Sequence, residues 1–290
     1  MYLLFCAMQR GIKCMKKRQS NRLSKQQVKG QGSVSIFHKE ARKHDKDVFN
    51  TSVVTMHLLE KEFPSLKFRY RKGLSKKEIN EALKRIDSYL GQTLFVEDAR
   101  IIPDGGMVEV LDDNNKWRII LVSEAKHQGN DIENIQKGIL VGKNKDQDIM
   151  MAGNAIERAY KNINEIANYM LAECYFPYVL FLEGSNFLTQ NVVVTRPDGR
   201  KVTLIYNAGN LNRLDRLTAS NYGMPINTNL CKNRHIKCNE STIMLQAVSI
   251  YTKSKGGHWN DKDMISIMLE IAKTSLKLLS KDLFNQITKK

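Results

Sequence analysis

The sequence predicts an α/β protein in which helices flank a central mixed β-sheet. Two observations support this class: short apolar segments typical of buried strands fill the middle of the chain, and apolar residues recur at helical spacing on both sides of them. The chain has 290 residues, of which 42% are hydrophobic, so it can bury a substantial core. No apolar run reaches the ~18 residues that a membrane-spanning helix needs, and we therefore expect no membrane association.

Three segments are expected to be helical. A capping box from Ser75 to Glu78 precedes apolar residues at helical spacing up to Leu90. Residues 148–171 carry apolar residues three and four apart along their length, which predicts a helix with one face in the core. The segment from Asp261 onward repeats this pattern.

The expected strands share apolar or alternating composition and are bounded by polar turns. A Pro-Asp-Gly turn at residues 196–200 separates the last two of them. The strands are predicted at residues 93–96, 107–111, 117–122, 176–182, 191–195 and 201–206.

The charge is concentrated at the start of the chain. The net charge is +16, and nine of the 46 basic residues precede the first acidic residue, Glu40. We interpret residues 1–35 as a flexible basic arm and residues 36–290 as a single domain, and we expect a polyanionic partner. A solvated tail without a ligand is the alternative.

The cysteines indicate the compartment. There are five, scattered through the chain and without a Cys-x-x-Cys pair. This usage favours a reducing, cytoplasmic environment.

The pattern with the clearest chemical meaning joins Asp104 to Glu124 and Lys126. The predicted hairpin of residues 107–122 lies between them, so an antiparallel return brings both carboxylates to the same edge of the sheet. Side chains two residues apart on a strand share a face, which places Lys126 beside Glu124.

Such a set suits metal-assisted phosphoryl chemistry. Two carboxylates, with the backbone carbonyl of Ala125 as a third ligand, fit Mg²⁺, and Lys126 would position or deprotonate a nucleophile. The alternative is a surface turn next to an exposed Glu-x-Lys pair. A carboxylate directly after a buried strand is costly unless it is paired or metal-bound, which favours the catalytic interpretation.

The helix predicted over residues 148–171 has a polar face opposite its apolar one. Asn154, Arg158 and Lys161 lie there, and asparagine and arginine are suited to contacts with adenine, guanine or phosphate. An ordinary solvated face is the alternative interpretation.

From about residue 15 to residue 290 the chain resembles the EcoRI family of type II restriction endonucleases, within the PD-(D/E)xK nuclease superfamily. The segments that carry the resemblance are QSNRL at residues 19–23, PDGG at 103–106, EAKHQG at 124–129, GNAIER at 153–158, FPYVLFLEGSNFL at 176–188 and NRLDRL at 212–217.

The resemblance implies a catalytic set of Asp104, Glu124 and Lys126 with Mg²⁺ as cofactor, in agreement with the ligands Asp104, Glu124 and Ala125 inferred from the hairpin. It implies a homodimer that cuts double-stranded DNA at a palindrome, GAATTC, to leave 5′-phosphates, and a DNA methyltransferase in the same system without a stable complex. Arms at residues 130–144 and 189–207 would embrace the duplex. The DNA-binding positions it implies are Met150, Asn154, Ala155, Glu157, Arg158, Arg213 and Arg216, and the polar helix face adds Lys161.

Three alternatives to an active enzyme of this specificity stay open. They are a catalytically impaired DNA-binding relative, a PD-(D/E)xK nuclease of different specificity, and a basic protein that binds nucleic acid with little sequence preference. The second is disfavoured by the retained Asn154, Arg158, Arg213 and Arg216. The last two are three residues apart and are expected on one helical face.

The chain departs from the family pattern in four places. Ile102 stands where the family has a lysine, and Asn130 and Asn144 replace basic residues in one arm. The first fourteen residues have no counterpart, so we expect translation to start at Met15. Residues 231–238 contain a Cys-x₃-His-x₂-Cys run that with His258 would make a zinc site, although a polar loop is the favoured interpretation.

Overall fold

The computed structural model describes residues 39–93, 95–139, 141, 153–215, 217 and 226–279. The chain divides into two compact units, residues 1–39 and 40–290, and the second contains the sheet and the helices described below. The basic arm expected at residues 1–35 and the proposed start at Met15 lie outside the described residues.

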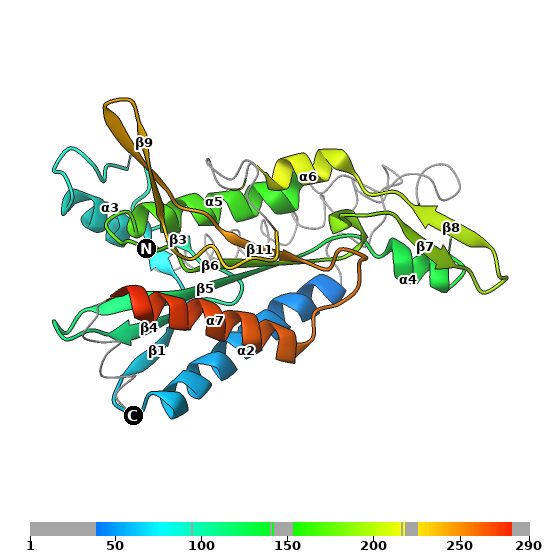
Figure 1. Cartoon of the computed structure of the whole chain (residues 1–290), viewed down its shortest axis with the longest axis horizontal. Helices are drawn as coiled ribbons and strands as arrows, with labels where there is room; N and C mark the ends of the chain where they lie inside the picture. Colours follow the sequence, from blue (N-terminus) through cyan, green and yellow to red (C-terminus); the bar gives the residue numbers. More distant parts are fainter. Residues whose placement is uncertain are drawn as a thin grey trace, which may run out of the picture. The chain divides into compact units, whose positions relative to one another are not determined.

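The centre of the second unit is a five-stranded mixed sheet, which confirms the predicted α/β class (Figure 1). The neighbouring pairs β1–β4 and β4–β5 are antiparallel, whereas β5–β6 and β6–β11 are parallel. In spatial order the strands are β1 (Phe68–Arg71), β4 (Met107–Leu111), β5 (Trp117–His127), β6 (Tyr178–Glu183) and β11 (Ser249–Thr252).

Strand β5 is longer than the sequence predicted. The expected strand ended at Val122, but β5 continues to His127, so Glu124 and Lys126 lie within the strand. The extension exists because residues 122–127 pair in register with residues 178–183 of β6. A neighbour from a distant part of the chain therefore fixes this half of β5.

Helices cover both faces of the sheet (Figure 1). On one face lie α2 (Lys39–Glu62) and α7 (Asp261–Leu279), and Ser52 of α2 lies 2.8 Å from Ser123 of β5 between hydroxyl oxygens. On the other face lies α5 (Gly153–Tyr169), whose Asn162 contacts the next strand residue, Glu124. Successive strand side chains alternate between faces, so the two contacts define opposite sides.

Packing between these layers forms the main core. The α7 residues Met264, Met268, Ile271 and Ala272 have no exposed surface, and α7 packs against β5. Helices α2 and α7 also contact each other through two polar interactions. The Thr55 hydroxyl donates a hydrogen bond to the Met268 sulfur, and Glu62 forms a 2.7 Å ion pair with Lys273.

The capping box at Ser75 and Glu78 is confirmed, because each side chain bonds the other residue's backbone nitrogen. It begins α3 (Lys76–Lys84), after the two-residue strand β2 (Leu74–Ser75), which pairs with β3 (Arg100–Ile101). The helix ends six residues before Leu90, contrary to prediction. The strand predicted at residues 93–96 is also wrong over its described residues, since Phe95 is 92% exposed and no sheet neighbour lies beside it.

A small second core lies under the segments expected to be arms. The predicted hairpin is confirmed as β7 (Val192–Thr195) and β8 (Lys201–Leu204), and β7 packs against α4 (Asp131–Gln136). Residues 140 and 142–144 of the first arm lie outside the described residues. The buried members of this core are Ile135, Val141, Leu188, Val194 and Leu204.

Four further elements complete the described fold. They are the 3₁₀ turn η2 (Ser185–Phe187), the helix α6 (Ala208–Leu214), and a hairpin of β9 (Arg234–Cys238) and β10 (Ser241–Leu245). The described residues include no helix with the length and apolar character needed to cross a membrane.

Candidate active site

The turn that carries Asp104 requires both of its glycines. A Cβ on Gly105 would lie 2.2 Å from the Ser123 hydroxyl oxygen, and one on Gly106, where φ is +68°, would lie 2.2 Å from the Tyr70 hydroxyl oxygen. Both glycines also form backbone hydrogen bonds with Ser123. The Gly105 nitrogen donates to the Ser123 carbonyl oxygen at 2.9 Å, and the Ser123 nitrogen donates to the Gly106 carbonyl oxygen at 3.1 Å. The turn is thus fixed against β5, which places Asp104 beside the strand.

The structure brings together the three residues that the hairpin argument singled out. The Lys126 ammonium donates to Asp104 Oδ2 at 2.6 Å, to the Ala125 carbonyl at 2.7 Å and to Glu124 Oε1. Side-chain exposure falls from 27% at Asp104 to 14% at Lys126 and 1% at Glu124. Four groups from a turn and one strand therefore converge at the edge of a buried region.

The Glu124 carboxylate has two further partners that the sequence did not reveal. Asn162 of α5 donates to both of its oxygens at 3.2 Å, and the buried Tyr178 hydroxyl of β6 donates to Oε2 at 3.1 Å. One available signal was the tyrosine in an otherwise apolar run of residues 176–182, because a buried hydroxyl needs a hydrogen-bond partner. These contacts orient a carboxylate that could otherwise rotate.

Burial dominates the electrostatics of this group. It raises the pKa of Glu124 to about 7, with Asp104 adding to the rise and Lys126 opposing it. Burial alone would lower the pKa of Lys126, but Glu124 and Asp104 raise it above its ordinary value. The lysine therefore stays an ammonium ion near neutral pH.

A further carboxylate, Asp45 of α2, lies in the same electrostatic field. Burial, followed by repulsion from Asp104, raises its pKa to about 6, while Lys126 opposes the shift. No sequence motif pointed to Asp45, since it comes from a helix that precedes the site by some sixty residues of chain.

The residues proposed to contact DNA are placed only in part. Glu157, Arg158 and Lys161 are exposed on α5. Asn154 and Ala155 belong to the first turn of α5, but their side chains, like all of Met150, lie outside the described residues.

The expectation that Arg213 and Arg216 share one helical face is not tested. Arg213 lies in α6, which has Asp215 as its C-cap, and Arg216 lies outside the described residues.

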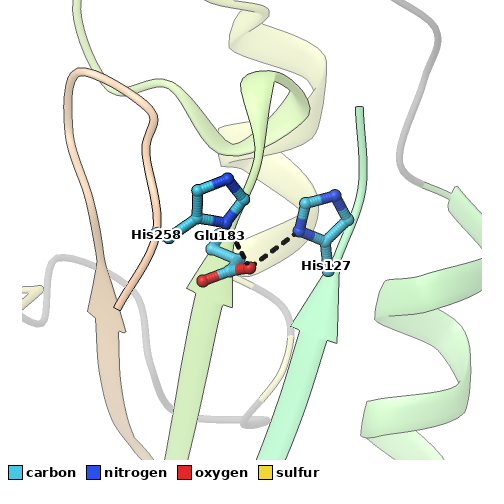
Figure 2. Close-up of side chains that lie close together, drawn as sticks. All are labelled: His127, Glu183 and His258. Carbon is cyan, nitrogen blue, oxygen red and sulfur yellow. Dashed lines mark hydrogen bonds and ion pairs between the residues drawn. The ribbon is translucent and has the colours of Figure 1, made fainter. Parts of the chain in front are cut away.

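A second polar cluster lies where β5 and β6 end (Figure 2). His127 Nδ1 and His258 Nδ1 approach the same oxygen, Glu183 Oε1, at 2.9 and 3.0 Å. Burial alone would raise the pKa of Glu183, but hydrogen bonds from the two histidines and the charge of His44 hold it at about 2. Glu183 follows a buried apolar segment, the signal that had pointed to Glu124.

This cluster also corrects the zinc alternative. His258 lies by Glu183, whereas the buried Cys231 contacts the Ser275 hydroxyl at 3.2 Å and Cys238 is exposed on β9. The described residues do not bring the Cys-x₃-His-x₂-Cys run and His258 into one group.

Comparison with known proteins gives the family. Residues 30–286 match the family described as Restriction endonuclease EcoRI. The chain belongs to this family. The type II restriction enzyme EcoRI of Escherichia coli is 59% identical over 274 residues, covering 94% of this chain and 99% of that enzyme. The type II restriction enzyme RsrI of Cereibacter sphaeroides is 49% identical over 267 residues, covering 92% and 96%.

These matches confirm the resemblance read from the sequence and identify the chain as a type II restriction endonuclease, a site-specific deoxyribonuclease. They extend across the sheet and the helices that hold Asp104, Glu124 and Lys126. The basic charge fits a protein of this EcoRI family, whose substrate is a polyanion.

Proposed function

We propose that this chain is a Mg²⁺-dependent endonuclease that cuts double-stranded DNA at GAATTC and leaves 5′-phosphates. The observation that carries the proposal is the convergence of Asp104, Glu124 and Lys126 on one point at the end of a buried strand. The relatives named EcoRI and RsrI support the specificity and the reaction.

The donor set fits Mg²⁺. Oxygen atoms of Asp104, Glu124 and Ala125 all face a single cation, the Lys126 ammonium, so the oxygens are already arranged around positive charge. Two carboxylates and a carbonyl are ligands that Mg²⁺ prefers, and it keeps water in its remaining positions. A bound Mg²⁺ would supply charge neutralisation at the phosphate and a more acidic water.

The protein's own residues supply the remaining parts of the mechanism. Asn162 and Tyr178 hold the Glu124 carboxylate in one orientation, and the hydrogen bond from Asn162 opposes the rise in pKa that burial causes. Lys126 keeps its proton, so it is better suited to orient the attacking water and to face the phosphate than to act as a base. The Gly105–Gly106 turn keeps Asp104 at the strand.

The DNA-recognition residues are proposed by the family resemblance and by exposure. Glu157, Arg158 and Lys161 lie on the exposed side of α5 and are available to a duplex; Arg213 would add a contact from α6. The β7–β8 hairpin and α4 would form the arms that embrace the DNA, since their own small core makes them a unit. Asn154 is added on the resemblance and on its place on the polar face of the helix, and Met150, Ala155 and Arg216 complete the set on the resemblance alone.

We further propose a homodimer, because a palindromic site is matched by a two-fold symmetric protein. A DNA methyltransferase of the same specificity would protect the host's DNA without forming a stable complex. A cytoplasmic location fits these roles and the free thiols of Cys174, Cys231 and Cys238.

The test is cleavage of a duplex that contains one GAATTC, in Mg²⁺, beside a duplex changed at one base pair. We expect only the first to be cut, with Glu124→Ala inactive and the exposed control Glu240→Ala fully active. Binding of both duplexes is measured in parallel by gel shift, and the mass of the complex by sedimentation. Selective binding without cleavage would reject the catalytic proposal, and equal cutting of both duplexes would reject the specificity.

A further inference from the structure

The ends of β5 and β6 and the loop before α7 bring together a second set of metal-binding side chains (Figure 2). His127 Nδ1, His258 Nδ1 and Glu183 Oε1 belong to a group whose ligand atoms all lie within 4.8 Å of one another. The imidazole rings are parallel, with an interplanar angle of 3° and centroids 5.9 Å apart, and both turn Nδ1 toward the carboxylate. Two imidazoles and one carboxylate therefore face a common point.

The other nitrogen of each ring is held from outside the group. His127 Nε2 lies 2.7 Å from the Asn130 side-chain oxygen, and His258 Nε2 lies 3.4 Å from Glu133 Oε1. In the ion-free protein each Nδ1 carries the hydrogen that it donates to Glu183, and a bound ion would replace that hydrogen while a hydrogen on Nε2 satisfies the outer acceptors. Metal-ligating histidines are typically fixed in this way, with the second ring nitrogen donating to an amide oxygen or a carboxylate.

The carboxylate between the rings is also fixed. Glu183 Oε2 accepts from the Trp259 backbone nitrogen at 2.9 Å and lies 3.4 Å from His44 Nδ1. These contacts leave Oε1 directed at the two histidines. The side chains of Glu183 and His127 are only 4% and 5% exposed, so the strand side of the group is rigid and shielded from water.

We propose that His127, Glu183 and His258 form a site for a divalent transition-metal ion of the Zn²⁺ class, distinct from the Mg²⁺ site proposed at Asp104 and Glu124. Imidazole nitrogens favour such ions, whereas Mg²⁺ prefers oxygen. Bonds of about 2.0–2.1 Å in a tetrahedral arrangement separate ligand atoms by roughly 3.3 Å, close to the present nitrogen–oxygen distances. The fourth position would hold water on the side of His258, which is 44% exposed.

The loop that carries His258 can adjust its position to complete the metal geometry. His258 follows Gly256 and Gly257, both at positive φ, in the loop between β11 and α7, whereas the other two ligands lie on strands. A bound ion would join this loop to the ends of β5 and β6. His127 and Lys126 are consecutive on a strand and point to opposite faces, so the site does not share side chains with the nuclease centre.

The test is titration of chelator-treated protein with Co²⁺ in excess Mg²⁺, followed by visible absorption. We expect one Co²⁺ per chain with nitrogen and oxygen ligands, no thiolate charge-transfer band, and displacement by Zn²⁺. Zn²⁺ should also raise the melting temperature. Even changes to residues that only support a metal ligand weaken binding about 10–100-fold, so His258→Ala should weaken Co²⁺ binding at least 100-fold and abolish the thermal shift.

Two variants distinguish this site from its rivals. His57→Ala removes an exposed histidine that also lies 2.9 Å from a carboxylate, that of Glu60, and should bind Co²⁺ like the unaltered chain. Glu124→Gln should keep Co²⁺ binding while losing nuclease activity. Unchanged binding in His258→Ala, or loss of binding in Glu124→Gln, would overturn the proposal, and neither result depends on whether the protein cuts GAATTC.

Discussion

Gly105→Ala is the most direct test of how the turn positions Asp104. The new methyl carbon would lie 2.2 Å from the Ser123 hydroxyl oxygen, 3.0 Å from Ser123 Cβ and 2.8 Å from a methyl carbon of Val48. The first distance is more than about 1 Å shorter than an ordinary contact. Ser123 cannot move away easily, because it is fully buried and bonded to Ser52 of α2.

The clash should lower both the stability of the fold and the rate of cleavage. Overpacking of a core typically costs about 1–3 kcal/mol of unfolding free energy. For a domain of this size each kcal/mol corresponds to about 2–4 °C, so we expect the melting temperature to fall by about 2–12 °C. The turn must relieve the clash by moving outward with Asp104, and a displacement of about 1 Å at a reacting group can reduce the rate about 100-fold.

The assay is a double-mutant cycle with Ser123→Ala, read by thermal unfolding and by the cleavage rate at saturating Mg²⁺. Removing the Ser123 hydroxyl relieves the shortest contact. The loss of unfolding free energy in the double variant should therefore be smaller than the sum of the two single losses by about 0.5–3 kcal/mol. Additivity within about 0.5 kcal/mol, together with an unchanged cleavage rate in Gly105→Ala, would refute the argument that the glycine fixes the position of Asp104.

Three further predictions follow from the site and its surroundings. Lys126→Ala should reduce the cleavage rate at least about 100-fold in single-turnover kinetics, because it removes a positioned charge. Selective DNA binding should persist in gel shift. A loss of binding equal to the loss of rate would contradict this. Without divalent ions, the stability of the fold should fall as pH rises from about 4.5 to about 7. Burial raises the pKa of Glu124 to about 7, so folding favours the neutral form and loses that advantage as the pH approaches 7. Glu124→Gln should flatten this dependence in thermal melts. Glu109→Ala should cost about 1–3 kcal/mol in denaturant unfolding, because it removes a fully buried carboxylate that bonds two partly exposed arginines, one of which keeps Glu78 as a partner, whereas the exposed control Asp198→Ala should change stability by less than about 0.5 kcal/mol.

The local parts of the site could be predicted from the sequence. The hairpin and the two-residue periodicity of a strand are sufficient to place Asp104, Glu124 and Lys126 together, since all three lie within one short stretch of chain. The capping box of Ser75 was equally predictable, because its partner is three residues away.

The long-range parts could not be predicted in the same way. Tyr178, Asn162 and Asp45 reach the site only through strand pairing and helix packing, and no spacing in the sequence encodes those contacts. The length of β5 has the same origin, because its last residues are held as a strand by β6. The error at residues 93–96 has the opposite cause: the composition is strand-like, but the described residues of this segment have no strand beside them to pair with.

The helix layer made by α2 and α7 has a consequence for the order of synthesis. Ribosomes make the chain from the N-terminus at about 5–20 residues per second, and α7 is made well after β5. Until α7 emerges, α2 alone covers this face of the sheet, and the fully buried Met264 and Met268 are missing from the core. A growing chain therefore already contains Asp104, Glu124 and Lys126 and the strand that carries two of them, but one side of that strand lacks part of its packing, so full nuclease activity should arise only after α7 has been made.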